Sequence, residues 1–371
     1  MMTEPIRVAQ VMGYMNGGGV EAVVMNYYRH IDREIIQFDF IVCDGSTLVP
    51  KDEIERLGGR VFMVSNYKNL ARYQRDLMHL YKKERWRIVH SHMNSLSVFP
   101  LRAAKKVGIP VRIAHSHSTS GRDEYFKNTV KFVLKKYSNV YPTDRFACGS
   151  RAGDWLFGKN SNYDVVPNAI DMSEFSRNDE KRLRLRRELG IAQEALVVGH
   201  VGRFMRQKNH IFLLQIFREV LERRKKSILL LIGSGPLFDE ILAMAERMGL
   251  RDNVLTLGQR GDIGELYNVF DVFCMPSLYE GLPVVSVECQ AAGVPMVLST
   301  AVSEEACLSN LIKFEDLASA PSEWADDILS FAGQVSIPTA KISEYDINIA
   351  AGHLAARYQD LYRDSLAECK K

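Results

Sequence analysis

Hydrophobic residues in this sequence recur as short apolar runs that alternate with segments of helical periodicity. Residues 6–12 form an apolar run that ends in glycine, and residues 20–31 follow with apolar positions three and four apart. A buried strand, a glycine turn and a helix are typical of the start of a parallel α/β sheet. The same pattern predicts further strands at residues 38–43, 60–64, 88–92, 111–117 and 145–148.

The alternation starts again in the second half of the chain. Strands are predicted at residues 196–201, 228–232, 254–257, 272–275 and 295–298, and an amphipathic helix at residues 347–366. Residues 172–186 are highly polar and charged, a composition that indicates a domain boundary. We therefore expect an α/β protein of two Rossmann-like domains, residues 1–167 with the terminal helix in 347–371, and residues 168–346, with a ligand cleft between them.

Charge is distributed unevenly between the two halves. The net charge is only +3, but residues 1–167 contain 25 Lys and Arg against 16 Asp and Glu, and the remainder is acidic. A basic half suggests an anionic partner, such as a membrane surface, a lipid phosphate or nucleic acid. Nucleic acid is disfavoured because the basic residues are spread over many predicted helices without a binding motif.

Cysteines and apolar runs bear on the cellular location. The six cysteines have neither metal-ligand nor redox spacing, which favours reduced thiols in a cytoplasmic protein. No signal-peptide core and no run of ~18 apolar residues is present. Residues 125–137 predict an amphipathic helix with lysines four apart beside aromatic residues. That helix is either a solvated basic face or a peripheral contact with the anionic inner face of the plasma membrane.

The strongest candidate site surrounds Glu280 and Glu288. Glycine and proline at positions 281 and 283 end an apolar segment, and a small apolar helix is predicted to begin near Pro283. Such a helix points its free N–H groups and positive dipole end at the loop, which creates an anion pocket. Arg203 and Lys208, in a loop about 75 residues upstream, supply the cations that this pocket needs.

Two His-Ser-His triplets end neighbouring predicted strands, where open parallel sheets bind ligands. Alternate residues of a strand share a face, so the histidines of each triplet can point the same way. We expect a structural role for His90 and His92 and an active-site role for His115 and His117. A four-histidine metal site is the alternative, although no carboxylate or cysteine is placed to complete it.

Taken together, four motifs resemble a known family across nearly the whole chain. They are residues 17–21 (Gly-Gly-Gly-Val-Glu), 165–171 (Val-Val-Pro-Asn-Ala-Ile-Asp), 202–209 (Gly-Arg-Phe through Gln-Lys-Asn) and the Glu280–Glu288 pair. The combination resembles the retaining GT-B glycosyltransferases that build bacterial exopolysaccharide and capsule. The resemblance implies two Rossmann-like domains, an N-terminal one that holds the acceptor and a C-terminal one that holds a nucleotide-sugar donor.

The resemblance also implies roles for individual residues. Arg203 and Lys208 would neutralise the diphosphate, Glu280 would face the transferred sugar, and Glu288 would accept the ribose hydroxyls. A histidine after the fourth strand contacts the donor sugar in this family, and either His115 or His117 matches it. Further donor and cleft positions are Gly18, Gly19, Glu21, Asn168, Gln259, Arg260, Gly281, Leu282, Pro283 and Val284.

The expected reaction moves a hexose from a nucleotide sugar, with UDP favoured by the resemblance, to a lipid-linked or oligosaccharide acceptor. No Asp-x-Asp motif occurs, so we expect neither a metal-clamped diphosphate nor a cofactor. Retention of the anomeric configuration is implied by the resemblance alone, and a front-face attack is expected because no carboxylate stands out as suited to act as a nucleophile. The alternatives are a catalytically silent subunit that stabilises a partner transferase, and a sugar-nucleotide epimerase of the same architecture.

Overall fold

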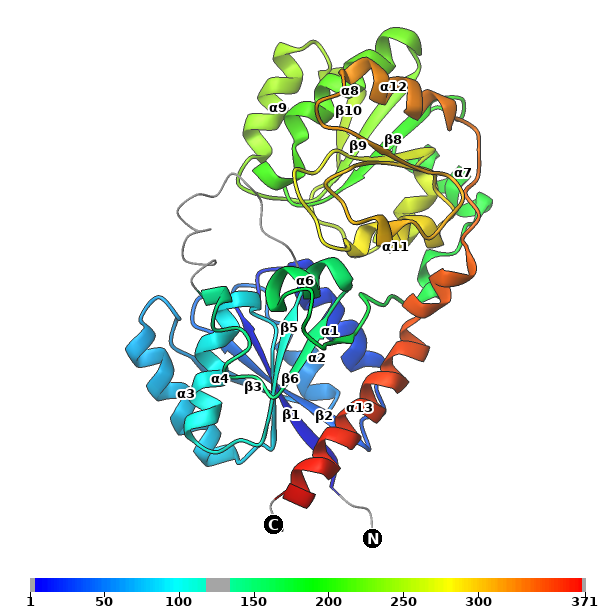
Figure 1. The fold of residues 1–371 in the computed structure, drawn as a ribbon. Coiled ribbons are helices and arrows are strands. Elements are labelled where there is room, and N and C mark those ends of the chain that lie inside the picture. Colours follow the sequence, from blue (N-terminus) through cyan, green and yellow to red (C-terminus); the bar gives the residue numbers. More distant parts are fainter. Residues whose placement is uncertain (1–3, 118–133, 369–371) are drawn as a thin grey trace. The chain divides into compact units, whose positions relative to one another are not determined.

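The computed structural model describes residues 4–117 and 134–368, which divide into two compact units (Figure 1). Unit 1 comprises Met1–Ile170 and Glu344–Lys371, and unit 2 comprises Asp171–Ser343. Most of the predicted basic helix at residues 125–137 lies outside the described residues. Among the helices that are described, none is long and apolar enough to cross a membrane.

Unit 1 contains a seven-stranded parallel sheet in the order β3-β2-β1-β4-β5-β6-β7. Its strands are β1 (Ile6–Gly13), β2 (Ile36–Cys43), β3 (Arg60–Val64), β4 (Ile88–Ser91), β5 (Val111–Ser116), β6 (Asp144–Ala147) and β7 (Asp164–Val165). β1, β2 and β4 are almost wholly buried, as expected for parallel strands covered on both faces. The predicted parallel α/β sheet is confirmed.

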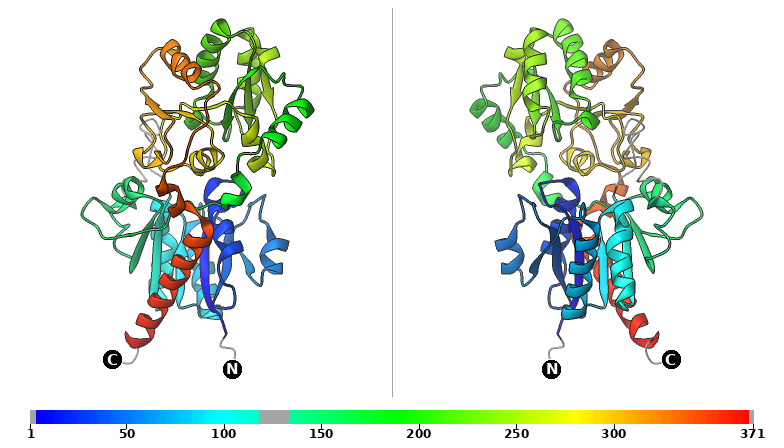
Figure 2. Two further views of the ribbon diagram at one scale, coloured as in Figure 1. Left: turned by 90° about the vertical axis from the view of Figure 1, so that its right-hand side faces the viewer. Right: turned by 90° about the vertical axis from the view of Figure 1, so that its left-hand side faces the viewer.

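The helices of unit 1 within its described residues are α1 (Gly19–His30), α2 (Lys51–Arg56), α3 (Leu70–Glu84), α4 (Val98–Lys106), α6 (Ser150–Phe157) and α13 (Ile347–Glu368), with a 3₁₀ turn at Asn94–Ser97. Both views of Figure 2 show α13, in red, running along the N-terminal sheet, and it packs against α1. The Arg357 guanidinium pairs with Asp164 of β7 at 2.7 Å. The last helix of the chain thus completes the first unit.

Unit 2 contains a six-stranded parallel sheet in the order β10-β9-β8-β11-β12-β13. Its strands are β8 (Leu196–Val201), β9 (Ser227–Ile232), β10 (Val254–Thr256), β11 (Val272–Met275), β12 (Met296–Ser299) and β13 (Ile312–Glu315). Its helices are α7 (Asp179–Glu188), α8 (His210–Arg223), α9 (Phe238–Arg247), α10 (Ile263–Leu266), α11 (Val284–Ala291) and α12 (Pro321–Ser330). Short 3₁₀ turns lie at Met172–Phe175, Arg206–Lys208, Arg251–Asn253, Tyr267–Val269, Glu304–Ala306 and Ala340–Tyr345.

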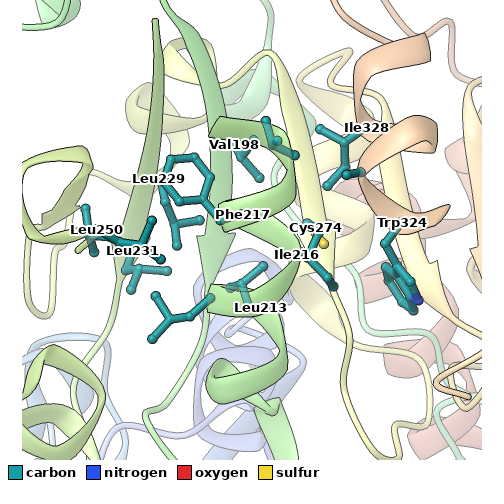
Figure 3. Close-up of a cluster of buried hydrophobic side chains, with 14 of the residues drawn as sticks. Val198, Leu213, Ile216, Phe217, Leu229, Leu231, Leu250, Cys274, Trp324 and Ile328 are labelled. Atoms are coloured by element: carbon teal, nitrogen blue, oxygen red, sulfur yellow. The ribbon is translucent and has the colours of Figure 1, made fainter. Parts of the chain in front are cut away.

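The core of unit 2 lies between its sheet and helices α8 and α12. Figure 3 shows Phe217 of α8 and Trp324 of α12 within one cluster that includes side chains of β8, β9 and β11. Both aromatic side chains are fully buried. This packing fixes the strands whose ends carry the candidate site.

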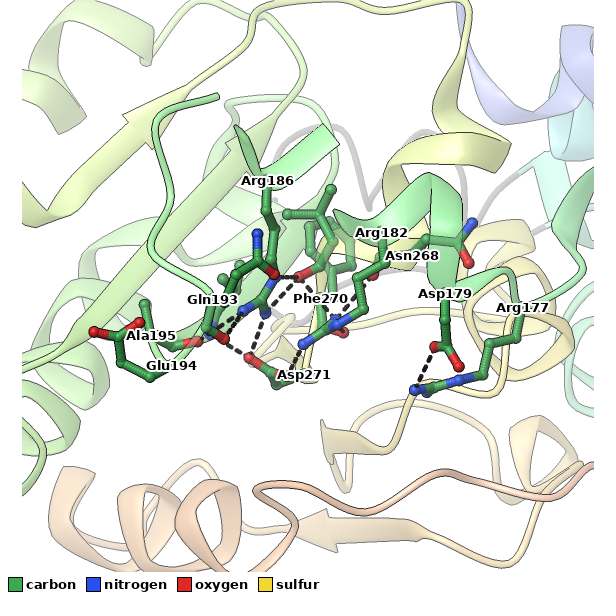
Figure 4. Close-up of polar contacts among 12 residues, drawn as sticks. Arg177, Asp179, Arg182, Arg186, Gln193, Glu194, Ala195, Asn268, Phe270 and Asp271 are labelled. Carbon is green, nitrogen blue, oxygen red and sulfur yellow. Dashed lines mark hydrogen bonds and ion pairs between the residues drawn. The ribbon is translucent and has the colours of Figure 1, made fainter. Parts of the chain in front are cut away.

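Residues 172–186, expected to mark a domain boundary, follow directly after the division between the units at Ile170 and Asp171, and they contain the 3₁₀ turn at Met172–Phe175 and most of α7. Arg186 is fully buried, and its guanidinium pairs with Asp271 at 2.7 Å (Figure 4). The same carboxylate pairs with Arg182 and accepts the Val197 N–H at 2.7 Å. Charged side chains here serve an internal network, which composition alone does not reveal.

Further elements were not among the predicted ones. The stretch after β12 contains β13 and α12. Residues 263–269 form the single turn α10 followed by a 3₁₀ turn. Helix α6 and the two-residue strand β7 were not predicted, because each is too short to show a period.

Candidate functional site

The predicted donor residues follow four neighbouring strands of the unit 2 sheet. Because all its strands are parallel, the loops after β10, β9, β8 and β11 leave the sheet at one edge. Carboxyl ends of strands are where such sheets bind ligands. The structure therefore places Arg203, Lys208, Glu280 and the Gln259–Arg260 pair at a common edge.

Two of these loops are hydrogen-bonded directly to each other. The Leu278 N–H donates to the Gln207 carbonyl at 2.8 Å, and the Gln207 side-chain amide donates to the Tyr279 carbonyl at 2.9 Å. These bonds connect the loop after β8 to the loop after β11 immediately before Glu280. The cationic loop and the acidic loop therefore form one rigid assembly.

An ion pair joins the same two loops. The Lys208 ammonium lies 2.7 Å from the Glu280 carboxylate, and the two side chains are only 14% and 11% exposed. Partial burial strengthens such a pair compared with one on the surface. Arg203 is exposed, and among the described residues no hydrogen bond or ion pair fixes its guanidinium. The site thus has one internally neutralised cation and one cation that faces solvent.

Glycines after β9 allow the chain to pass close to the cationic loop. A Cβ atom at Gly233 would lie 2.1 Å from the Gly202 carbonyl oxygen, and one at Gly235 would lie 2.5 Å from that of Phe204. The backbone of Phe204 also donates to the Ser234 carbonyl at 3.0 Å. The sequence showed these glycines only as the end of a strand, and their role in shaping the neighbouring loop was not predicted.

Helix α11 begins where it was predicted to begin. Pro283 is its N-cap and Val284 its first residue, while Gly281 and Leu282 before them are buried. The Ser286 hydroxyl and N–H both satisfy the Pro283 carbonyl. The first-turn N–H groups of this helix are directed toward its N-terminus, where a helix favours an anion.

Glu288 lies one turn further along α11. Its carboxylate accepts a hydrogen bond from the Tyr267 hydroxyl at 2.7 Å. Burial raises the pKa of Glu288 to about 7, and the nearby carboxylate of Glu174 acts in the same direction. Tyr267 was not predicted, since no local pattern connects it with a partner 21 positions later in the chain.

Gln259 and Arg260 follow β10 and are both exposed. The preceding Gly258 has a φ of +63°, and its carbonyl accepts the Gly233 N–H at 2.8 Å. Arg260 forms an ion pair with Asp262 at 2.6 Å. These two predicted residues therefore lie on a loop that is connected through Gly233 to the loop after β9.

In unit 1, the predicted glycine turn precedes α1. Gly18 is the N-cap of this helix and Gly19 its first residue. The Glu21 carboxylate accepts the N–H groups of Asn16, Gly17 and Gly18 at 2.6–3.0 Å. Glu21 thus stabilises its own turn as a helix cap.

Asn168 is buried beside α1, on the segment after β7. The Tyr27 hydroxyl donates to the Pro167 carbonyl at 2.8 Å, and the Asn26 amide donates to the Ala169 carbonyl at 3.3 Å. Helix α1 therefore holds both neighbours of Asn168 in place.

The four histidines of the two triplets form a single buried cluster in unit 1. His90 and His115 lie 3.1 Å apart between ring nitrogens, and His92 and His117 lie 2.8 Å apart. Burial lowers the pKa of all four imidazoles, to about 3 for His117. Ring nitrogens of His90, His92 and His115 also lie within 4.8 Å of one another, the spacing that a transition metal would require.

The structure therefore gathers the predicted residues into two groups. Unit 2 contains the cations, the two glutamates, the start of α11 and the Gln259–Arg260 loop. Unit 1 contains the histidine cluster, the glycine turn with Glu21, and Asn168. A nucleoside diphosphate suits the first group, since this group offers cations and helix N–H groups to phosphates and an acceptor to ribose hydroxyls.

Comparisons with known proteins give matches over both units. Residues 17–174 match the family model described as Glycosyltransferase Family 4, and residues 181–306 match the model described as Glycosyl transferases group 1. A Bacillus subtilis protein named "Putative glycosyltransferase EpsF" is 37% identical over 87% of this chain and 86% of its own length. Escherichia coli UDP-Gal:alpha-D-GlcNAc-diphosphoundecaprenol alpha-1,3-galactosyltransferase is 26% identical over 85% of this chain and 86% of its own length.

Solved structures give a similar picture of the fold. Anabaena Alr3699/HepE in complex with UDP superimposes with a TM-score of 0.73 at 17% identity, covering 98% of each chain. WaaG, a glycosyltransferase involved in lipopolysaccharide biosynthesis, superimposes with a TM-score of 0.69 at 14% identity, again over 98% of each chain.

Proposed function

The chain belongs to the glycosyltransferase family of these relatives and has their GT-B fold, and we propose that it transfers a hexose from a UDP-sugar to a lipid-linked or oligosaccharide acceptor. The E. coli relative is named for UDP-galactose and a diphosphoundecaprenol acceptor, and a Staphylococcus aureus relative for capsular polysaccharide biosynthesis. HepE has been solved with UDP and with UDP-glucose. The product would be part of an exopolysaccharide or capsule.

One observation carries the proposal: a cationic loop and an acidic loop are bonded together beside the start of α11. In the reaction, the bond between the anomeric carbon and the phosphate oxygen breaks, and UDP leaves with the electron pair. Arg203, Lys208 and the α11 N–H groups would stabilise the negative charge that develops on the diphosphate. Such fixed groups are effective because they need little reorganisation during the reaction.

Two glutamates complete the proposed donor site. Glu288, already an acceptor for the Tyr267 hydroxyl, would accept ribose hydroxyls. Glu280 would face the transferred sugar and stabilise positive charge at its anomeric carbon. The acceptor oxygen would attack from the face that the diphosphate leaves, and its proton would pass to the departing phosphate oxygen, so that configuration is retained. We propose that the cations come from the protein and that no metal is required.

A cytoplasmic location at the inner face of the plasma membrane fits this function, because the E. coli relative is named for a lipid-linked acceptor. The basic segment at residues 125–137 remains our prediction for the membrane contact. Its test is co-sedimentation of the protein with anionic vesicles, compared with neutral ones.

Ligand-induced stabilisation tests the donor site. We expect UDP, and not GDP or ADP, to raise the melting temperature, since a ligand at a hundredfold excess over its Kd adds about 2.7 kcal/mol of stability. Arg203→Ala and Lys208→Met should weaken this shift. Lys225→Met is the matched control, because Lys225 is exposed and precedes the amino end of β9, whereas the proposed site lies at the carboxyl ends of the strands.

Turnover then tests the reaction. Incubation with UDP-glucose or UDP-galactose and a GlcNAc-diphosphate lipid should release UDP and form a retained glycoside, also in the presence of EDTA. Arg203→Ala should lower kcat by roughly 10²–10³, as loss of one donor to a developing anion does elsewhere. Absence of a shift with every nucleotide, together with absence of product, would instead indicate a silent subunit.

A further inference from the structure

The histidine cluster is part of a longer hydrogen-bonded array, which we call the histidine network. Its members, in order of contact, are His115, His90, Tyr358, Gln10, His92 and His117. The three central distances are 2.6 Å between His90 Nδ1 and the Tyr358 hydroxyl, 3.2 Å from there to Gln10 Nε2, and 2.7 Å between Gln10 Oε1 and His92 Nε2. The network thus connects β1, β4 and β5 to helix α13.

Each end of the network is an unsatisfied ring nitrogen. His115 Nε2 and His117 Nδ1 are buried, and neither has a hydrogen-bond partner among the described residues. Leaving a buried polar atom unpaired costs about 1–3 kcal/mol. Both residues lie at the carboxyl end of β5, where a parallel sheet binds its ligands. The two nitrogens are therefore candidates to bind a polar group of a ligand.

The proton count of the network is fixed. Burial lowers the pKa of every ring and raises the pKa of Tyr358, so each imidazole is neutral and carries one N–H. The four rings, the Tyr358 hydroxyl and one amide N–H of Gln10 together supply about six protons, and each of the hydrogen bonds in the network uses one. One proton is therefore left over at an end of the network. One end of the network must therefore be a donor and the other an acceptor.

The Gln10 amide sets the direction. Its oxygen faces His92 and its nitrogen faces Tyr358, so His92 carries its proton on Nε2, and the Tyr358 hydroxyl donates to His90 Nδ1. Following each link outward gives all four rings the same tautomer, protonated on Nε2. His115 then ends as a donor and His117 as an acceptor. If the oxygen and the nitrogen of the Gln10 amide exchanged places, donor and acceptor would be exchanged in every hydrogen bond of the network. All four rings would then carry their proton on Nδ1.

We propose that the histidine network orients His115 as a donor and His117 as an acceptor toward sugar hydroxyls, and that Gln10 and Tyr358 are positioning residues. A hydroxyl donates and accepts at once, so hydroxyls of the transferred sugar or of the acceptor sugar match this pair of ends. The proposal deepens the glycosyltransferase function and depends on it for the identity of the ligand. The uniform tautomer does not depend on it.

Nitrogen NMR of histidine-labelled protein tests the network directly. In the wild-type protein at pH 7, all four rings should show the Nε2–H tautomer, assigned from single histidine variants. A mixed set of tautomers, or four Nδ1–H rings, would overturn the proposal. So would one equivalent of transition metal bound at His90, His92 and His115, because it would occupy the nitrogens that form the links.

Tyr358→Phe removes one hydroxyl from the middle of the network. The two halves would then choose their tautomers independently, so that only about one molecule in four keeps the original pattern, and kcat/KM should fall about fourfold. The ring signals of all four histidines should become averages of both tautomers. UDP affinity should not change, since the proposed nucleotide site lies in unit 2.

Tyr81→Phe is the matched control, because its hydroxyl is also buried in unit 1 but has no hydrogen-bond partner among the described residues and lies outside the network. It should alter neither the four tautomers nor kcat/KM. Unchanged His115 signals in Tyr358→Phe would overturn the proposal even if the enzyme proves inactive on all sugars tested. In the wild type, signals of His115 or His117 should move with UDP-glucose but not UDP if the transferred sugar is the ligand. If the acceptor sugar is the ligand, these signals should move only with the GlcNAc-diphosphate lipid. Signals that move with neither probe would refute the ligand assignment.

Discussion

Single side chains in this protein derive their chemistry from partners far away in the sequence. Glu288 is an example, because its half-buried carboxylate accepts a hydrogen bond from the Tyr267 hydroxyl. Its pKa of about 7 lies above the ordinary value of 4.5. Between these two values the folded protein holds a proton that the unfolded chain has released. Stability contributed by this group is therefore present at low pH and is lost as the pH rises toward 7.

Glu288→Gln should remove this pH dependence. At pH 4.5 the variant and the wild type should melt at similar temperatures, whereas at pH 8 the variant should be more stable, because glutamine cannot ionise. Each 1 kcal/mol gained corresponds to roughly 2–4 °C in Tm for a unit of this size. Melting curves of both proteins from pH 4.5 to 8 give the measurement, and parallel curves would show that Glu288 titrates normally.

Residue types at the proposed donor site could be predicted from the sequence because their signals are local. Glycine and proline at 281 and 283 mark a helix start, and Arg203 and Lys208 lie in a short polar loop after an apolar strand. The partners of these residues could not be predicted. Nothing near Gln10 or Tyr358 in the sequence indicates that the two side chains meet, since 348 positions separate them.

At the scale of elements, the turn after β9 has no room for a side chain at Gly233. A Cβ atom at Gly233 would lie 2.1 Å from a carbonyl oxygen, and the residue has a φ of +141°. Gly233→Ala should therefore displace the cationic loop, lower stability by about 1–3 kcal/mol and weaken UDP binding. Gly261→Ala serves as the control, because a Cβ atom there would have no neighbour within 4 Å. Equal melting temperatures and UDP affinities for the two variants would contradict this explanation.

Elements with a clear period were predictable, and short or highly charged elements were not. The strands from β8 to β12 appeared as apolar runs, and α1 and α13 as helical patterns. Helix α7 was not predicted, because arginines and acidic residues dominate its sequence and indicate only a domain boundary. The fold of α7 depends on Asp271, which lies outside this helix and whose carboxylate compensates the charge of the buried Arg186. Tertiary pairing therefore decides a structure that composition misrepresents.

At the scale of the whole molecule, the two units have separate cores and separate candidate sites. Asp271→Asn should destabilise unit 2 by about 3–5 kcal/mol, because it leaves the buried Arg186 without its carboxylate. Hydrogen exchange should then accelerate across residues 171–343 and remain unchanged across residues 4–117. Asp179→Asn, which removes the exposed partner of Arg177 at the first residue of α7 (Figure 4), should change neither region. Acceleration in both regions would show that the units unfold together.

The Lys208–Glu280 ion pair has a consequence for selectivity among anions. An incoming anion can recruit Lys208 only by separating it from a carboxylate 2.7 Å away. Orthophosphate would have to meet this cost with a single phosphate group, whereas a nucleoside diphosphate brings a second phosphate, a ribose and a base to share it. We therefore expect the pair to disfavour orthophosphate more than a nucleoside diphosphate, so that the proposed donor site discriminates in favour of the nucleotide.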